Sequence, residues 1–146
     1  MLELSVTRYI DAPPEKVWDV MANRQEEWWC PKPWRVEIIE QVRRPGGSSR
    51  MVMYGPDGEE MPQDGVILAW DEGRRFVTTD AMTADFVPAE PFMIGIWEIE
   101  PEGDGTRYTA RARHWSEDAM TQHRDMGFEE GWGVCADQLA ALVEEN

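Results

Sequence analysis

The side chains that could perform acid–base chemistry or bind a metal are few in this sequence. There are two histidines, His114 and His123, and two cysteines, Cys30 and Cys135, which lie far apart along the chain. None of the CxxC, HExxH, GxSxG or P-loop patterns accompanies them. We therefore expect reduced thiols, no metal site and no cofactor. Any catalysis would depend on a histidine acting as a general acid or base.

His114 is the stronger candidate for that chemistry because of its place in the sequence. On the last expected strand, Tyr108 and His114 alternate onto one face, which we expect to look inward near the start of the following helix. An inward carboxylate such as Asp80 or Glu98 could act with His114 as an acid–base pair. The alternative is a structural histidine held in the core. His123 is expected on a helix, in contact with solvent.

Aromatic residues and methionines are abundant, with eight tryptophans and nine methionines among 146 residues. Such residues either fill a core or line a pocket for an apolar ligand. Alternation along strands and helical periodicity select nine candidates for such a pocket. For Met51 and Met53 the choice is open, because either face of their strand could look inward. The candidates are Met51, Met53, Met93, Trp97, Tyr108, His114, Met120, Phe128 and Trp132.

An antiparallel sheet would position most of these side chains. Turn signals separate seven runs rich in strand-forming residues. A short helix that opens at Pro13 and Pro14, and a second one at residues 23–29, follow the first run. The expected strands cover residues 3–10, 34–42, 50–55, 63–70, 74–82, 92–100 and 106–115.

One long helix is expected at the end of the chain. The stretch from Ser116 to Asn146 contains no proline, and its apolar residues recur at steps of four and three, which predicts about 27 helical residues. The residues of this apolar stripe are Phe128, Trp132, Cys135, Leu139 and Leu142. A single helix after a run of strands must bury its stripe against their sheet, which gives the α+β class.

Length and charge narrow the classes of partner and compartment. A chain of 146 residues is expected to form one domain, residues 1–146. Its net charge of −15 argues against nucleic acid as a partner. The sequence lacks a signal-peptide pattern and an apolar run of eighteen residues, so we expect no membrane association and a cytoplasmic location.

Several segments together resemble the SRPBCC superfamily, which has the START/Bet v 1-like fold, and within it the Hsp90-ATPase-activator-homolog-like group. The matches are similar in order and spacing over nearly the whole chain, while the Asp71–Gly73 turn and the Ser48-Ser49 pair depart from the group's pattern. The matching segments are residues 12–18, 28–31, 44–47, 55–58, 65–68, 97–101 with 105–108, and 126–132 with 138–139.

The resemblance implies a helix-grip fold, in which a curved seven-stranded antiparallel sheet wraps around one long C-terminal helix. It also implies binding of a small hydrophobic or aromatic molecule between sheet and helix. One alternative is an enzyme like the superfamily's polyketide cyclases and dehydratases, with His114 as acid or base. Another is an activator of an Hsp90-type chaperone ATPase, or another stress-related partner protein. A homodimer is compatible with all three. Because a fold does not fix an activity, these alternatives stay open.

Overall fold

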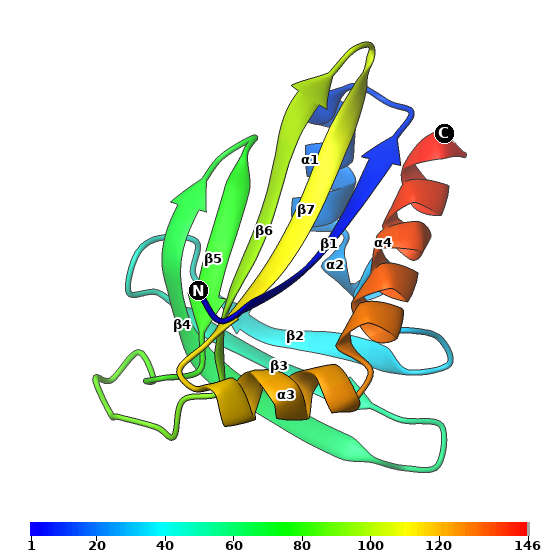
Figure 1. The fold of residues 1–146 in the computed structure, drawn as a ribbon. Coiled ribbons are helices and arrows are strands. Elements are labelled where there is room, and N and C mark those ends of the chain that lie inside the picture. Colours follow the sequence, from blue (N-terminus) through cyan, green and yellow to red (C-terminus); the bar gives the residue numbers. More distant parts are fainter. Residues whose placement is uncertain (146) are drawn as a thin grey trace.

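Seven antiparallel strands form one sheet in the computed structural model, which describes residues 1–145 (Figure 1). The sheet order is β1-β7-β6-β5-β4-β3-β2, so β1 and β2 are the two edges. The strands are β1 (Glu3–Ile10), β2 (Arg35–Gln41), β3 (Ser48–Tyr54), β4 (Glu60–Asp71), β5 (Arg75–Thr79), β6 (Met93–Glu102) and β7 (Gly105–His114). The seven expected strands are all present, with ends shifted by up to three residues. The α+β helix-grip fold is therefore confirmed.

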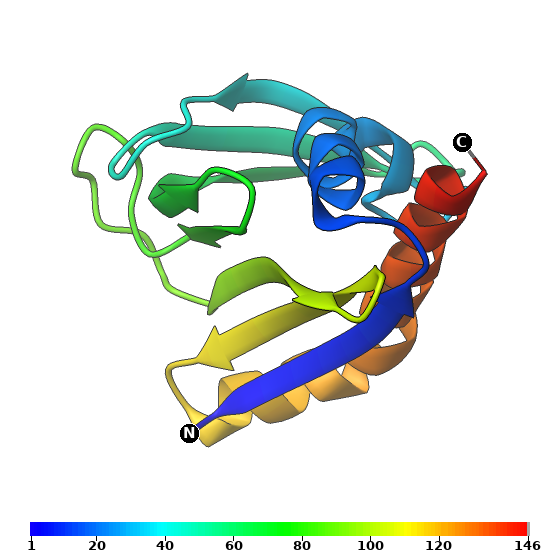
Figure 2. The ribbon, with the colours of Figure 1, turned by 90° about the horizontal axis from the view of Figure 1, so that it is seen from above.

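Two short helices, α1 (Pro14–Asn23) and α2 (Gln25–Trp28), follow β1, as expected. Pro14 occupies the first turn of α1, where its missing N–H costs no helical hydrogen bond. Two further helices, α3 (Glu117–Asp125) and α4 (Phe128–Glu144), end the described chain. Figure 2 shows the strongly bent sheet, with α1, α2 and α4 near its two edges. Of these helices, α4 contacts β1 and α2 contacts β2.

The C-terminal helix is interrupted, so the prediction of one continuous helix is wrong. Gly127 has a φ of +91°, which ends α3 and lets α4 start in a new direction. Ser116 caps α3 by accepting a hydrogen bond from the backbone N–H of Ala119 at 3.1 Å. The apolar stripe itself is confirmed, because its first four residues are buried on α4. Asn146 lies outside the described residues.

β4 contributes to the bend of the sheet. The first half of this strand pairs with β3 and the second half with β5, and the register shifts between Ile67 and Ala69. Such an irregularity bends a strand and increases its local twist. The predicted strand at residues 74–82 is too long, because β5 already ends at Thr79. There the Asp80 carboxylate turns the chain by accepting the N–H groups of Phe92 and Met93.

The apolar core fills one end of the space between the concave face of the sheet and the helices. Ile10, Val17, Met21, Tyr108 and Leu139 are almost fully buried there. Within residues 1–145, no helix is both long and apolar enough to cross a bilayer.

Candidate functional site

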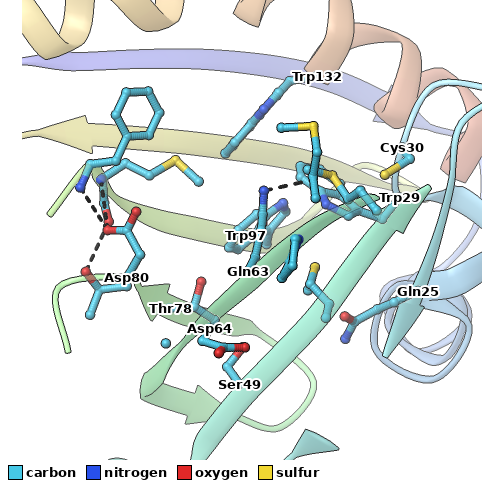
Figure 3. Close-up of a pocket in the computed structure, with 18 of the residues that line it drawn as sticks. Gln25, Trp29, Cys30, Ser49, Gln63, Asp64, Thr78, Asp80, Trp97 and Trp132 are labelled. Atoms are coloured by element: carbon cyan, nitrogen blue, oxygen red, sulfur yellow. Dashed lines mark hydrogen bonds between the residues drawn. The ribbon is translucent and has the colours of Figure 1, made fainter. Parts of the chain in front are cut away.

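A cavity of about 520 Å³ lies beyond this core, between the sheet and the break that separates α3 from α4 (Figure 3). Its walls come from β2 to β6, from α2 and the three residues that follow it, and from the two C-terminal helices. The loop that connects β5 to β6 closes one side through Asp80, Ala89, Glu90 and Phe92.

Three tryptophans form one wall. Trp97 of β6 stacks on Trp132 of α4, with ring centroids 5.4 Å apart. Trp29 packs edge-on against both rings, at 5.4 Å from Trp97 and 5.1 Å from Trp132. The six-membered ring of Trp97 lies over Gly95 and occupies the space that a side chain there would need. The three rings support one another and present a rigid aromatic surface to the cavity.

Sulfur-containing side chains line much of the remainder. Met51, Met53, Met61, Met93 and Met126 all lie on the cavity. Flexible, polarisable methionines adapt to ligands of different outline. Cys30 and Cys135 also line it, and burial raises the thiol pKa to about 11 for Cys30 and about 12 for Cys135. Both thiols are therefore protonated at neutral pH and act as small apolar groups rather than nucleophiles.

Five of the nine pocket residues predicted from the sequence lie on the cavity: Met51, Met53, Met93, Trp97 and Trp132. The other four are not part of its lining. Tyr108 is fully buried under the Trp28 ring, and Phe128 packs behind Trp132 with centroids 4.6 Å apart. Met120 is partly buried on α3, and His114 lies behind His123. Strand alternation identified the correct face, but not how far along each strand the cavity extends.

Sequence reasoning missed several lining residues, among them Trp29, Met61, Phe92 and His123. Trp28, the last residue of α2, is only 1% exposed, packs edge-on against Tyr108 and also borders the cavity. Trp29 lines the cavity, as Figure 3 shows. No sequence pattern separates the two adjacent tryptophans. The next residues, Cys30 with a φ of +86° and the cis Lys32-Pro33 peptide, make the backbone irregular.

The two histidines form a hydrogen-bonded pair, and His123, not His114, reaches the cavity. His114 Nε2 lies 2.9 Å from His123 Nδ1, and His114 Nδ1 lies 3.4 Å from the Leu2 carbonyl oxygen. The expectation of a solvated His123 is wrong, since only 7% of it is exposed. Burial lowers the pKa of His114, and burial together with the nearby His114 lowers the pKa of His123 to about 4.

This pair predicts a pH-dependent stability. In the unfolded chain His123 has an ordinary pKa of 6.5, against about 4 in the folded protein. The unfolded state therefore binds more protons between these values, so the free energy of unfolding should fall as the pH drops from 6.5 to 4. We expect a loss of about 2 kcal/mol from His123, measured by urea unfolding at a series of pH values.

The matched variant is His123→Asn, whose side-chain amide can still donate to His114 but does not titrate. Its unfolding free energy should depend less on pH over the same window, by about the same 2 kcal/mol. Identical pH profiles for the two proteins would show that His123 titrates normally in the folded state.

Metal binding finds no support in residues 1–145, where no group of three or more His, Cys, Asp or Glu side chains is close enough to share an ion.

One family model matches most of the chain. The model of the activator of Hsp90 ATPase homolog 1-like proteins matches residues 11–144. A crystal structure of protein NE0264 from Nitrosomonas europaea is 34% identical, with a TM-score of 0.89 over 98% of this chain and 94% of that one. Protein Ms6760 from Mycobacterium smegmatis is 31% identical, with a TM-score of 0.79 over 97% and 90%. Among functionally curated proteins, none matches the chain.

Proposed function

The chain belongs to the family of activator of Hsp90 ATPase homolog 1-like proteins, and we propose that it binds a small apolar or aromatic molecule in the cavity between the sheet and α4. The fold of this family commonly binds hydrophobic ligands. The observation that carries the proposal for this chain is the 520 Å³ cavity, whose lining includes four tryptophans and five methionines.

The cavity has the size and the lining of a ligand site. Protein interiors are normally packed to the density of organic crystals, so a space of this volume beside a packed core is unusual. Pockets for small ligands typically measure about 300–1,000 Å³ and combine apolar walls with a few polar groups. This cavity fits both criteria, because His123 and three glutamines accompany the aromatic and sulfur-containing walls.

Titration with N-phenyl-1-naphthylamine, an uncharged fluorescent probe, tests the proposal. We expect saturable binding with one probe per chain and energy transfer from tryptophan, since Trp29, Trp97 and Trp132 would touch the probe. Neutral aromatic ligands of this size typically bind with micromolar dissociation constants, about −8 kcal/mol. Probe fluorescence that rises without saturation, or that unfolded protein reproduces, would contradict a defined site.

In the enzymatic alternative, the candidate acid or base becomes His123 instead of His114. His114 does not line the cavity, so His123 would have to contact a substrate in a cyclase-like or dehydratase-like reaction, with His114 behind it. The chaperone alternative rests on the family's description rather than on a feature of these residues. A homodimer, a cytoplasmic location and a single domain remain predictions from the sequence.

A further inference from the structure

We propose that the cavity selects aromatic molecules that donate hydrogen bonds and carry no negative charge, such as phenols and arylamines. This inference rests on the proposed function and specifies the class of ligand. It follows from three features of the lining: the sign of its charged groups, the direction of the histidine hydrogen bonds, and the way in which its other polar groups are already paired.

All charged side chains on the cavity are acidic in the described part of the chain: Asp64, Asp80 and Glu90 line it, and no lysine or arginine does. Asp64 is partly neutralised by Arg50, at 3.4 Å. Asp80 accepts two backbone N–H groups, from Phe92 at 2.9 Å and Met93 at 3.3 Å, without a cationic partner. An anionic ligand would give up its hydration and meet only negative charge, which disfavours carboxylates and phosphates.

The hydrogen bonds of the histidine pair determine whether the free ring nitrogen of His123 is a donor or an acceptor. The Leu2 carbonyl oxygen can only accept, so Nδ1 of His114 carries the proton that points to it. Neutral His114 then accepts at Nε2, and Nδ1 of His123 donates across 2.9 Å. His123 is itself neutral at neutral pH, because burial lowers its pKa to about 4. Its Nε2 is consequently a lone-pair acceptor.

This acceptor is open to a guest. Among residues 1–145, the side-chain polar atoms sealed from solvent without a partner are Trp97 Nε1 and the Tyr108 hydroxyl. Nε2 of His123 is not among them, although His123 lines the cavity and uses only Nδ1 in the pair. Nε2 is therefore not sealed from solvent, and because its residue lines the cavity we infer that a hydroxyl or amino group of a ligand can reach it, whereas the Trp97 N–H is sealed.

Each glutamine on the cavity already uses one of its two side-chain N–H groups within the protein. Gln41 donates to the Gln25 side-chain oxygen at 3.1 Å, and Gln25 donates to the Ala22 carbonyl oxygen at 3.2 Å. Gln63 directs its amide toward the sulfur of Met53 at 4.0 Å. Thr79 donates its hydroxyl to a backbone carbonyl, so Ser49 and Thr78 keep the free hydroxyls, which can donate or accept. Together with the carboxylate oxygens of Asp64, Asp80 and Glu90 and with Nε2 of His123, these groups give the lining more acceptors than donors.

Three naphthalenes of similar size test the selectivity by isothermal titration calorimetry at neutral pH: 2-naphthol, 2-methoxynaphthalene and 2-naphthoate. The first donates a hydrogen bond, the second has the same oxygen without its proton, and the third is an anion. We expect 2-naphthol to bind at least about tenfold more tightly than either of the others, as one hydrogen bond in a dry site allows.

The possible results separate this inference from the proposed function. Equal affinity for 2-naphthol and 2-methoxynaphthalene, or tighter binding of 2-naphthoate, would overturn the selectivity and leave the proposed function standing. Failure of all three compounds and of N-phenyl-1-naphthylamine to bind would overturn both.

A variant of His123 tests whether this residue causes the selectivity. His123→Asn keeps a donor for His114 at the position of Nδ1, and its oxygen corresponds to Cδ2 and falls short of Nε2, so the affinity ratio of 2-naphthol to 2-methoxynaphthalene should fall to about one. The matched control is Gln122→Asn, an exposed neighbour on α3, which should keep the wild-type ratio. Circular dichroism establishes folding, and an unchanged ratio in folded His123→Asn would overturn the role of His123. If that variant does not fold, the comparison of the three compounds on the wild-type protein decides alone.

Discussion

Replacing Gly131 by phenylalanine is expected to weaken the binding of N-phenyl-1-naphthylamine by about 100-fold or more, while the protein stays folded. Gly131 lies on α4 and lines the cavity. A Cβ atom placed on it would have only one neighbour within 4 Å that belongs to another part of the chain, the ring of Pro31 at 4.0 Å. A larger side chain therefore has room to enter, and it would occupy volume that the ligand needs.

Replacing Gly131 by alanine is expected to stabilise the protein without weakening ligand binding. Glycine in a helix interior costs about 1 kcal/mol relative to alanine, so Gly131→Ala should raise the free energy of unfolding by about that amount. A single methyl group fills little of a 520 Å³ cavity, so Gly131→Ala should bind the probe nearly as the wild type does. This makes Gly131→Ala the matched control for Gly131→Phe.

Probe titration and urea unfolding of the two variants measure both effects. Wild-type affinity in folded Gly131→Phe would place the ligand somewhere other than this cavity. Loss of binding in both variants would indicate that the helix, rather than the free volume, had been disturbed. A site that keeps a glycine at the expense of helix stability is the pattern expected where open space serves binding.

Much of the fold is predictable from the sequence because its determinants are local. Each of the expected turns contains glycine, proline or aspartate, and β1 was predicted with both ends correct. The break at Gly127 was missed for a different reason. Gly131 and Gly133 lie only a few residues further on and remain helical, so composition does not reveal which glycine adopts a positive φ. That choice is made by the packing of α3 and α4.

The site was less predictable because it depends on contacts between distant segments. His123 was assigned to solvent from its helical surroundings, yet Phe92, from the loop before β6, packs on its ring at 4.9 Å, and His114 bonds to it. Tyr108 lies on the inward face as predicted, but Trp28 of α2 covers it. Periodicity determines the direction of a side chain from its own element. Periodicity does not show which other helix or strand packs against that side chain.

The second large effect is expected from Trp132→Ala, which should lower the free energy of unfolding by about 3 kcal/mol. Trp132 is only 8% exposed and joins several rings: Trp97 stacks on it, Trp29 meets it edge-on, and Phe128 lies 4.6 Å away. Truncation would remove these contacts and merge the vacated space with the existing cavity. Since one side of the ring already borders that cavity, the expected loss lies at the lower end of the usual range for tryptophan.

Urea unfolding followed by circular dichroism measures this loss, and Trp115→Ala is its control. Trp115 is 52% exposed and lies outside the cavity lining, so its removal should change stability by no more than about 0.5 kcal/mol. If Trp132→Ala were as stable as the control, the three tryptophans would not hold α4 against the sheet. The aromatic wall would then be a consequence of the fold, and the cavity would need another source of rigidity to keep its volume open.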